Sequence, residues 1–97
     1  MGAENRFFKE TIEAVEMHKQ LVRWVKMKKE QEAALEYDDK CKGIYREEGL
    51  RRAKDFQNTM ADRLGLTQVE EVYISIESED NKIIITMLEK ELFKERG

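Results

Sequence analysis

The sequence predicts an α+β fold, with a helical segment followed by a β-hairpin and a short C-terminal helix. Two observations carry this prediction. Apolar residues recur at helical spacing up to about residue 64, and they alternate with polar residues after Gly65. The chain has 97 residues and no proline, so glycines supply the breaks. We expect one domain over 1–97, helical over 5–64, with the hairpin at 71–87 and the last helix at 88–95.

The first helix is expected to begin near Asn5, a residue that suits an N-cap. Its main apolar line is flanked on both sides by further apolar or weakly polar side chains. The line is formed by Phe8, Ile12, Val15 and Val22, and its flanks by Phe7, Thr11, His18, Leu21 and Val25. These positions cover about half of the helix circumference, which is typical of a helix packed on one side.

The first helix is then interrupted in pattern but not in phase. Lys26, Lys29 and Glu30 stand where apolar residues would continue the line. The line resumes in the same phase at Ala33, Tyr37, Cys41 and Ile44. Because the phase is the same on both sides of the interruption, we favour one continuous helix to about Arg46. The alternative is that the chain folds back near residues 28–32 and forms a three-helix monomer.

A second helix is expected from about residue 50 to 64. Gly43 and Gly49 bracket the break before it, and Gly65 follows its last turn, where glycine adopts the left-handed conformation at little cost. Its apolar line has a different phase from that of the first helix and is formed by Leu50, Ala53, Gln57, Met60 and Leu64.

The hairpin is indicated by two β-rich runs around a polar turn. If Asp80 and Asn81 form a two-residue turn with positive φ, Ile76 pairs with Ile85 and Ile74 pairs with Met87. Six apolar residues then share one face of the hairpin, namely Val72, Ile74, Ile76, Ile83, Ile85 and Met87. After the hairpin, Leu88 and Leu92 lie four residues apart, which favours the C-terminal helix.

The element lengths favour a homodimer. A helix over residues 5–46 would be about 60 Å long, whereas one over 50–64 spans about 22 Å and cannot cover it. An isolated two-stranded hairpin is marginal in water and needs another layer on its apolar face. We therefore expect paired long helices, with the hairpins joined into a four-stranded sheet. The expected protein contacts are Met17, Leu21 and Trp24 on the helix flank and Tyr73, Ile84 and Leu88 on the second face of the hairpin.

The charge of the chain excludes a strongly basic nucleic-acid binder. Eighteen Lys and Arg stand against 21 Asp and Glu, giving a net charge of −3. Basic residues nevertheless cluster on two segments, and the alternative function is nucleic-acid binding through a basic helix face formed by Lys19, Arg23, Lys26, Arg51 and Arg52.

No motif for catalysis or for a cofactor is present. The phosphate-binding and nucleophile patterns are missing, so we expect no cofactor and no enzyme. His18 falls near the middle of the apolar line and is expected to be a hydrogen-bonded core residue. Cys41 is expected to be a small buried apolar residue, and a single cysteine with no apolar run of membrane length indicates a cytoplasmic protein.

Four carboxylates have a spacing that resembles a known metal site. Glu10 and Glu13, followed by Glu36 and Asp39, give the ExxE and ExxD pattern of the all-helical nucleotide pyrophosphatases of the MazG type. The resemblance implies a magnesium-dependent nucleotide pyrophosphohydrolase. Those enzymes direct their carboxylates into the helical bundle, whereas Glu10 and Glu13 lie opposite the apolar line. This function is therefore weaker than the other two, which are protein binding and nucleic-acid binding.

By exclusion, the sequence predicts a small non-enzymatic protein that acts by binding. We expect it to bind itself as a homodimer and to bind another protein, as an adaptor, regulator or inhibitor of the kind found among bacterial and phage accessory proteins. Large apolar and aromatic side chains anchor such interfaces, which is why the two apolar flanks are the expected contact surfaces.

Overall fold

The computed structural model describes residues 2–88 and 90–97, and the side chains of residues 2–7 and 88 lie outside that description. Within the described residues, three helices and four short strands make up an α+β fold. In chain order they are α1 (Gly2–Lys28), α2 (Gln31–Glu48), α3 (Leu50–Arg63), β1 (Leu66–Gln68), β2 (Tyr73–Glu79), β3 (Lys82–Leu88) and β4 (Phe93–Glu95). The predicted α+β class, the helix before Gly65 and the β-hairpin are therefore present, whereas the continuous first helix and the C-terminal helix are not.

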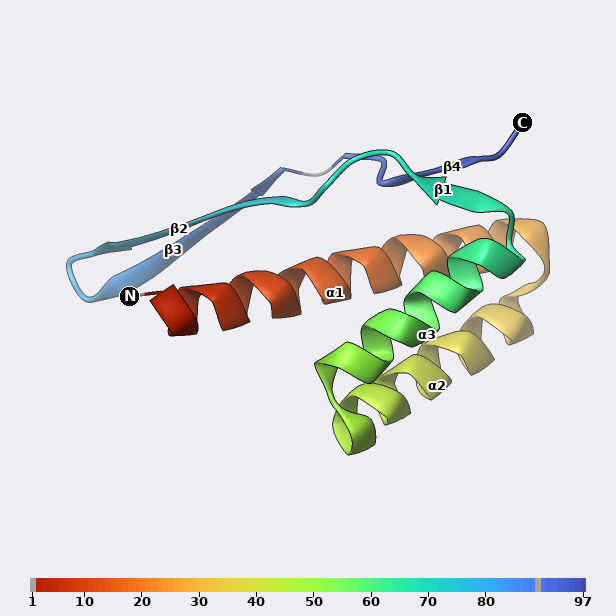
Figure 1. Ribbon diagram of the computed structural model, residues 1–97, viewed down its shortest axis with the longest axis horizontal. Helices are drawn as coiled ribbons and strands as arrows, with labels where there is room; N and C mark the ends of the chain where they lie inside the picture. The colour runs from red at the N-terminus through yellow and green to blue at the C-terminus, as the bar shows by residue number, and fades with distance from the viewer. Residues whose placement is uncertain (1, 89) are drawn as a thin grey trace.

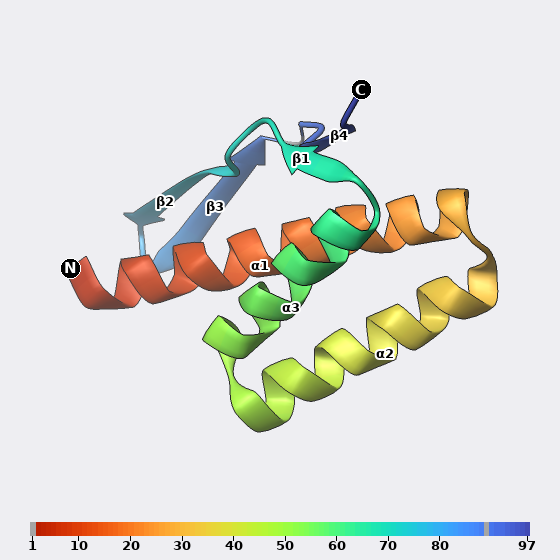
Figure 2. The ribbon, with the colours of Figure 1, turned by 45° about the vertical axis from the view of Figure 1, so that its right-hand side comes forward.

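Helix α1 lies between the strands and the other two helices (Figure 1). The β2–β3 hairpin runs along the N-terminal half of α1, and β1 and β4 lie over its C-terminal half, while α2 and α3 pack on the opposite side (Figures 1 and 2). Two separate antiparallel sheets result, one of β1 with β4 and one of β2 with β3.

The expected continuous helix over residues 5–46 is wrong, because the chain folds back after Lys28. Glu30 is extended, with φ −148° and ψ 171°, and α2 then runs antiparallel to α1. This is the predicted alternative of a fold-back near residues 28–32. The charged residues that interrupt the apolar line are left at an exposed bend, and the fold-back buries Tyr37 and Cys41 of α2 within the same chain.

The buried face of α1 is rotated from the predicted line. Met17, Leu21 and Val25 are core residues, whereas Phe8 and Val15 of the predicted line are exposed. The reason is that α1 has neighbours on two sides, so its buried arc is set by where α2, α3 and the strands lie. The core that they form contains Met17, Leu21, Val25, Ala34, Tyr37, Ala61, Leu64, Leu66, Leu92 and Phe93.

Glycine geometry ends α2 and α3 as the sequence predicts. Gly49 has φ +96° between α2 and α3, and Gly65 has φ +70° directly after α3. Both values lie in the region that side chains disfavour, so these positions suit glycine. The second predicted helix, over residues 50–64, corresponds to α3.

The predicted hairpin register is confirmed. Asp80 and Asn81 have φ of 49° and 62°, as a two-residue turn of type I′ requires. Ile74 pairs with Met87 and Ile76 with Ile85. The turn geometry and the alternation of apolar residues therefore specify the same pairing.

The expected C-terminal helix over residues 88–95 is wrong. Residues 82–88 belong to β3, and Phe93–Glu95 form β4, which pairs antiparallel with β1 and places Phe93 opposite Gln68. Leu92 and Phe93 are buried in the core. A short apolar segment does not by itself distinguish helix from strand, and here the backbone of β1 provides the pairing partner.

Buried Gln20 fastens the C-terminal segment to α1. Its side-chain Nε2 donates to the Lys90 carbonyl at 2.7 Å, and its Oε1 accepts from the Leu92 N–H at 2.8 Å. One amide side chain thus satisfies two backbone groups beside the core, and in a helix those two groups would bond to other backbone groups of that helix instead.

No helix of the described chain is long and apolar enough to cross a membrane.

Candidate protein-interaction surfaces

The hairpin leaves half of its apolar face uncovered. Ile74, at the end near the core, is buried against the helical layer. Toward the turn, on the same face, Ile83 is 64% exposed and Ile85 is 48% exposed. The face is therefore a packed surface at one end and an open apolar surface at the other.

The opposite face of the hairpin carries an exposed isoleucine among polar residues. Ile84 is 42% exposed and points away from the face that carries Ile83 and Ile85, because side chains alternate along a strand. Three consecutive isoleucines of β3 are thus exposed to solvent. Exposed large apolar side chains on both faces of one strand make this strand a candidate contact site.

The backbone of the hairpin is also open. In the described part of the chain, β2 and β3 pair only with each other, so each has a free outer edge. The two edges differ in charge, because β2 carries Glu77 and Glu79 whereas the only charged residue of β3 is Lys82 at its first position. A long apolar edge strand without charges is a template for pairing with another strand.

A second surface is a groove between the three helices. It has a volume of about 460 Å³ and is bounded by Thr11 and Val15 of α1, Tyr45 and Arg46 of α2, and Ala53 of α3. Its walls are mainly apolar, and Val15 and Tyr45 are exposed at its rim. The groove is where the predicted apolar line of α1 is left without a helix to cover it.

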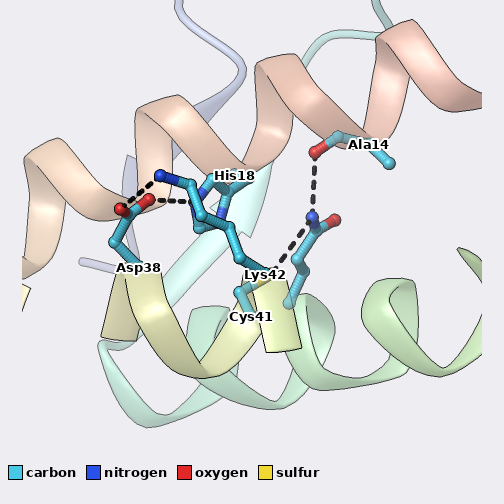
Figure 3. A network of polar contacts seen from close by, with 6 residues as sticks. Ala14, His18, Asp38, Cys41 and Lys42 are labelled. Carbon is cyan, nitrogen blue, oxygen red and sulfur yellow. Dashed lines mark hydrogen bonds and ion pairs between the residues drawn. The ribbon is translucent and has the colours of Figure 1, made fainter. Parts of the chain in front are cut away.

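A polar network joins α1 to α2, and two of its residues, His18 and Lys42, line this groove (Figure 3). His18 Nε2 donates to Asp38 Oδ1 at 2.5 Å, and Lys42 Nζ contacts Asp38 Oδ2 at 2.9 Å. An ionised carboxylate only accepts, so the histidine ring is the donor of this hydrogen bond. The Lys42 ammonium lowers the pKa of Asp38, with a further contribution from His18, against the opposing effect of burial.

The histidine of this network is held as a structural residue. Its ring stacks on Tyr37 at a centroid distance of 5.6 Å, and Tyr37 stacks on Phe56 at 5.3 Å. Burial raises the pKa of the Tyr37 hydroxyl far above its ordinary value. The prediction that His18 is a hydrogen-bonded core residue is confirmed for the hydrogen bond, whose partner is a carboxylate, but His18 is partly buried and lies outside the core.

Cys41 is close to the network but is not activated by it. It is buried, and Gln57 Nε2 lies 3.9 Å from its Sγ while also donating to the Ala14 carbonyl at 2.8 Å (Figure 3). Burial raises the pKa of the Cys41 thiol, which opposes formation of the reactive thiolate. Cys41 therefore has the environment of the buried apolar residue that the sequence predicts.

The predicted contact residues fall into three groups. Met17 and Leu21 are core residues of the single chain, so their flank is not available to a partner. Trp24 is partly buried against the core. Tyr73 and Ile84 are exposed on the same hairpin face, as predicted, and Leu88 lies in β3 with its side chain outside the described residues.

The basic residues do not form one surface. Lys19, Arg23 and Lys26 lie on the C-terminal half of α1, whereas Arg51 and Arg52 lie at the start of α3, at the other end of the helical layer (Figure 1). Lys19 contacts Glu16 at 3.5 Å and Arg52 contacts Glu48 at 3.6 Å. The fold separates the two clusters that a basic nucleic-acid face would need to join.

The four carboxylates of the metal-site resemblance do not converge. Glu13 contacts Lys54 of α3 at 3.7 Å, and Glu36 and Asp39 are exposed on α2. Asp38, which lies between Glu36 and Asp39 in the sequence, contacts His18 of α1 instead. Among the described residues, no three His, Cys, Asp or Glu side chains group closely enough to hold a metal ion.

Comparison with known proteins adds no relative. No family model, no curated protein and no solved structure matches this chain. The surfaces of the chain are then the only ground for a functional proposal. Of these, the sequence indicated the hairpin, through its β-rich runs, but not the groove, because the groove exists only after α2 folds back on α1.

Proposed function

We propose that this chain is a small protein-interaction module that associates with a second copy of itself through the β2–β3 hairpin. It belongs to the class of adaptors, regulators and inhibitors, which act by binding rather than by chemistry. The observation that carries the proposal is the run of exposed isoleucines at Ile83, Ile84 and Ile85 on a strand with a free edge.

The marginal stability of an isolated hairpin supports self-association through this region. A two-stranded ribbon is marginally stable in water, and here only its inner end packs on the helical layer. Covering the outer end removes apolar surface from water at roughly 25 cal/mol per Å². The helices share a core within one chain, whereas the outer end of the hairpin packs on no layer of its own chain, so the hairpin gains from a partner.

The experiment is a measurement of mass by light scattering on a sizing column, at several protein concentrations. We expect a mass near twice 11.5 kDa for the native chain. The double variant Ile83→Lys with Ile84→Lys places two charges on the contact surface and is expected to be a monomer. Its circular dichroism spectrum should keep the helical signal, because neither residue belongs to the core.

A matched control distinguishes this surface from exposed apolar residues in general. Met27 is 67% exposed at the end of α1, far from the hairpin tip, so Met27→Lys makes the same kind of change elsewhere. We expect Met27→Lys to remain a dimer. A native chain that stays monomeric at every concentration would contradict the proposal.

A further inference from the structure

We infer that two copies join by antiparallel pairing of β3 with β3, around a two-fold axis at Ile85, to form a four-stranded sheet in the order β2-β3-β3-β2. The inference rests on the proposed function and specifies its partner, edge and register. It is argued from the hairpin register, from the charges of the two edges and from the requirement that a two-fold interface be self-complementary.

The first step is which backbone groups of β3 face outward. Glu79 and Lys82 close the two-residue turn, and such a closing pair exchanges both of its hydrogen bonds within the hairpin. Bonded and non-bonded pairs alternate along an antiparallel ladder. The N–H and C=O groups of Ile83, Ile85 and Met87 therefore point to the outer edge of β3.

The second step is the choice of edge. Pairing β2 with β2 would bring Glu77 and Glu79 of both copies into one narrow region, where like charges destabilise the pairing. Pairing β3 with β3 brings together mostly uncharged residues. The edge that lacks protective charges is also the one with the exposed isoleucines.

The third step is the register. With the axis at Ile85, all seven residues of β3 are paired, Ile83 lies opposite Met87, and Lys82 lies opposite the uncharged position 88. An axis at Ile84 would oppose Met87 to Asn81, whose positive φ belongs to the turn. An axis between two residues would oppose outward groups to inward ones and form no ladder.

This arrangement accounts for both exposed faces of the hairpin. The two-fold axis is perpendicular to the sheet, so like faces of the two hairpins lie on the same side. Ile83 and Ile85 of one copy then lie beside Met87 and Ile85 of the other, and Ile84 lies opposite Thr86 on the second face. Each exposed isoleucine of β3 gains an apolar or β-branched neighbour across the new edge.

The register can be tested by a disulfide that forms only between different variants. Ile84 and Thr86 form a non-bonded pair across the axis, where Cα atoms lie about 4.5 Å apart, within the range of a disulfide. The distance from position 84 to its own copy is roughly 7–8 Å, which is too long. Both side chains are exposed and point away from the helical layer.

The experiment uses the full chain with Cys41→Ala, so that the native thiol does not react. Proteins carrying Ile84→Cys and Thr86→Cys are oxidised separately and as a mixture, after light scattering has established the mass of each. We expect a covalent dimer in the mixture and its absence from either protein alone. The control is Ser75→Cys, the β2 partner of Thr86, which should give no covalent dimer when mixed with Ile84→Cys.

The other outcomes separate the inference from the proposed function. A covalent dimer of Ile84→Cys alone would place the axis at residue 84 and overturn the register. A dimeric mass with no cross-link in the mixture, or cross-linking through Ser75→Cys, would overturn β3 pairing while leaving self-association intact. A monomeric mass of the native chain would contradict the proposed function itself.

Discussion

The helical layer and the hairpin differ in how far their apolar residues are buried. In the helices, Leu21 and Tyr37 are buried by elements of the same chain after the fold-back at Glu30. In the hairpin, Ile83 and Ile85 share a face with buried Ile74 but extend beyond the layer that covers it. A correctly formed local element can thus be left incomplete in its tertiary contacts, and this difference is where a partner is expected.

The largest expected effect comes from emptying the centre of the helical layer. Leu21 is fully buried, so Leu21→Ala should reduce the free energy of unfolding by about 3 kcal/mol. Ile84→Ala on the exposed hairpin face should cost under about 0.5 kcal/mol in the monomer. Urea denaturation at one low protein concentration measures both, and a similar loss in the two variants would contradict the contrast between the regions.

The next effect concerns the link between α1 and the C-terminal segment. Gln20→Ala leaves both the Lys90 carbonyl and the Leu92 N–H without their side-chain partner. This should lower the free energy of unfolding by about 2 kcal/mol. The exposed Gln31→Ala serves as the control and should change stability little. Hydrogen exchange of the Leu92 amide should speed up in the first variant only, and unchanged protection there would show that other contacts hold the segment.

A smaller effect is expected in the polar network of the helical layer. Asp38→Asn weakens the contacts with His18 and Lys42 and should cost about 1 kcal/mol near pH 7. The pKa of Asp38 is lower in the folded chain, so its stabilisation is present above the ordinary carboxyl value of about 3.9 and is lost as pH falls through the folded value. Denaturation of both proteins from pH 6 to pH 2 should show the difference closing at the acidic end. If the difference in the free energy of unfolding between the two proteins persists at pH 2, the effect of Asp38→Asn comes from packing and not from the charge.

The most local effect is expected in the hairpin. Asn81 has positive φ, so Asn81→Gly should stabilise the turn by a few tenths of a kcal/mol, and Asn81→Ala should destabilise it by about 1 kcal/mol. Hydrogen exchange in β2 and β3 should respond to both changes, while exchange in the core of α1 stays the same. A matching response in α1 would mean that the hairpin and the helices open as one unit.

The sequence predicted best where short-range geometry decides the structure. The register of Ile76 with Ile85 follows from a two-residue turn, and the ends of α2 and α3 follow from Gly49 and Gly65. The prediction failed at the bend after Lys28 and at residues 93–95. In both places the apolar pattern fits two conformations, and the choice depends on a segment distant in sequence.

The candidate site divides in the same way. Tyr73 and Ile84 were predicted as exposed contact residues, because alternation places them on the second hairpin face. Met17 and Leu21 were also predicted as contacts but are core residues, since α2 and α3 cover that flank of α1. The exposure of Ile83 and Ile85 could not be predicted, because it depends on how far the helical layer extends beneath the hairpin.

The sequence by itself determined that the chain before Gly65 is helical, the turn at Asp80 and Asn81 and the two faces of the hairpin. These features rest on φ preferences and on spacing along a few residues. Only the tertiary structure decided the fold-back of α2, the face of α1 that is buried, the pairing of β1 with β4 and the open edge of β3. Those features arise from contacts between residues far apart in the chain, whose free energy depends on the surface that the assembled layers leave uncovered.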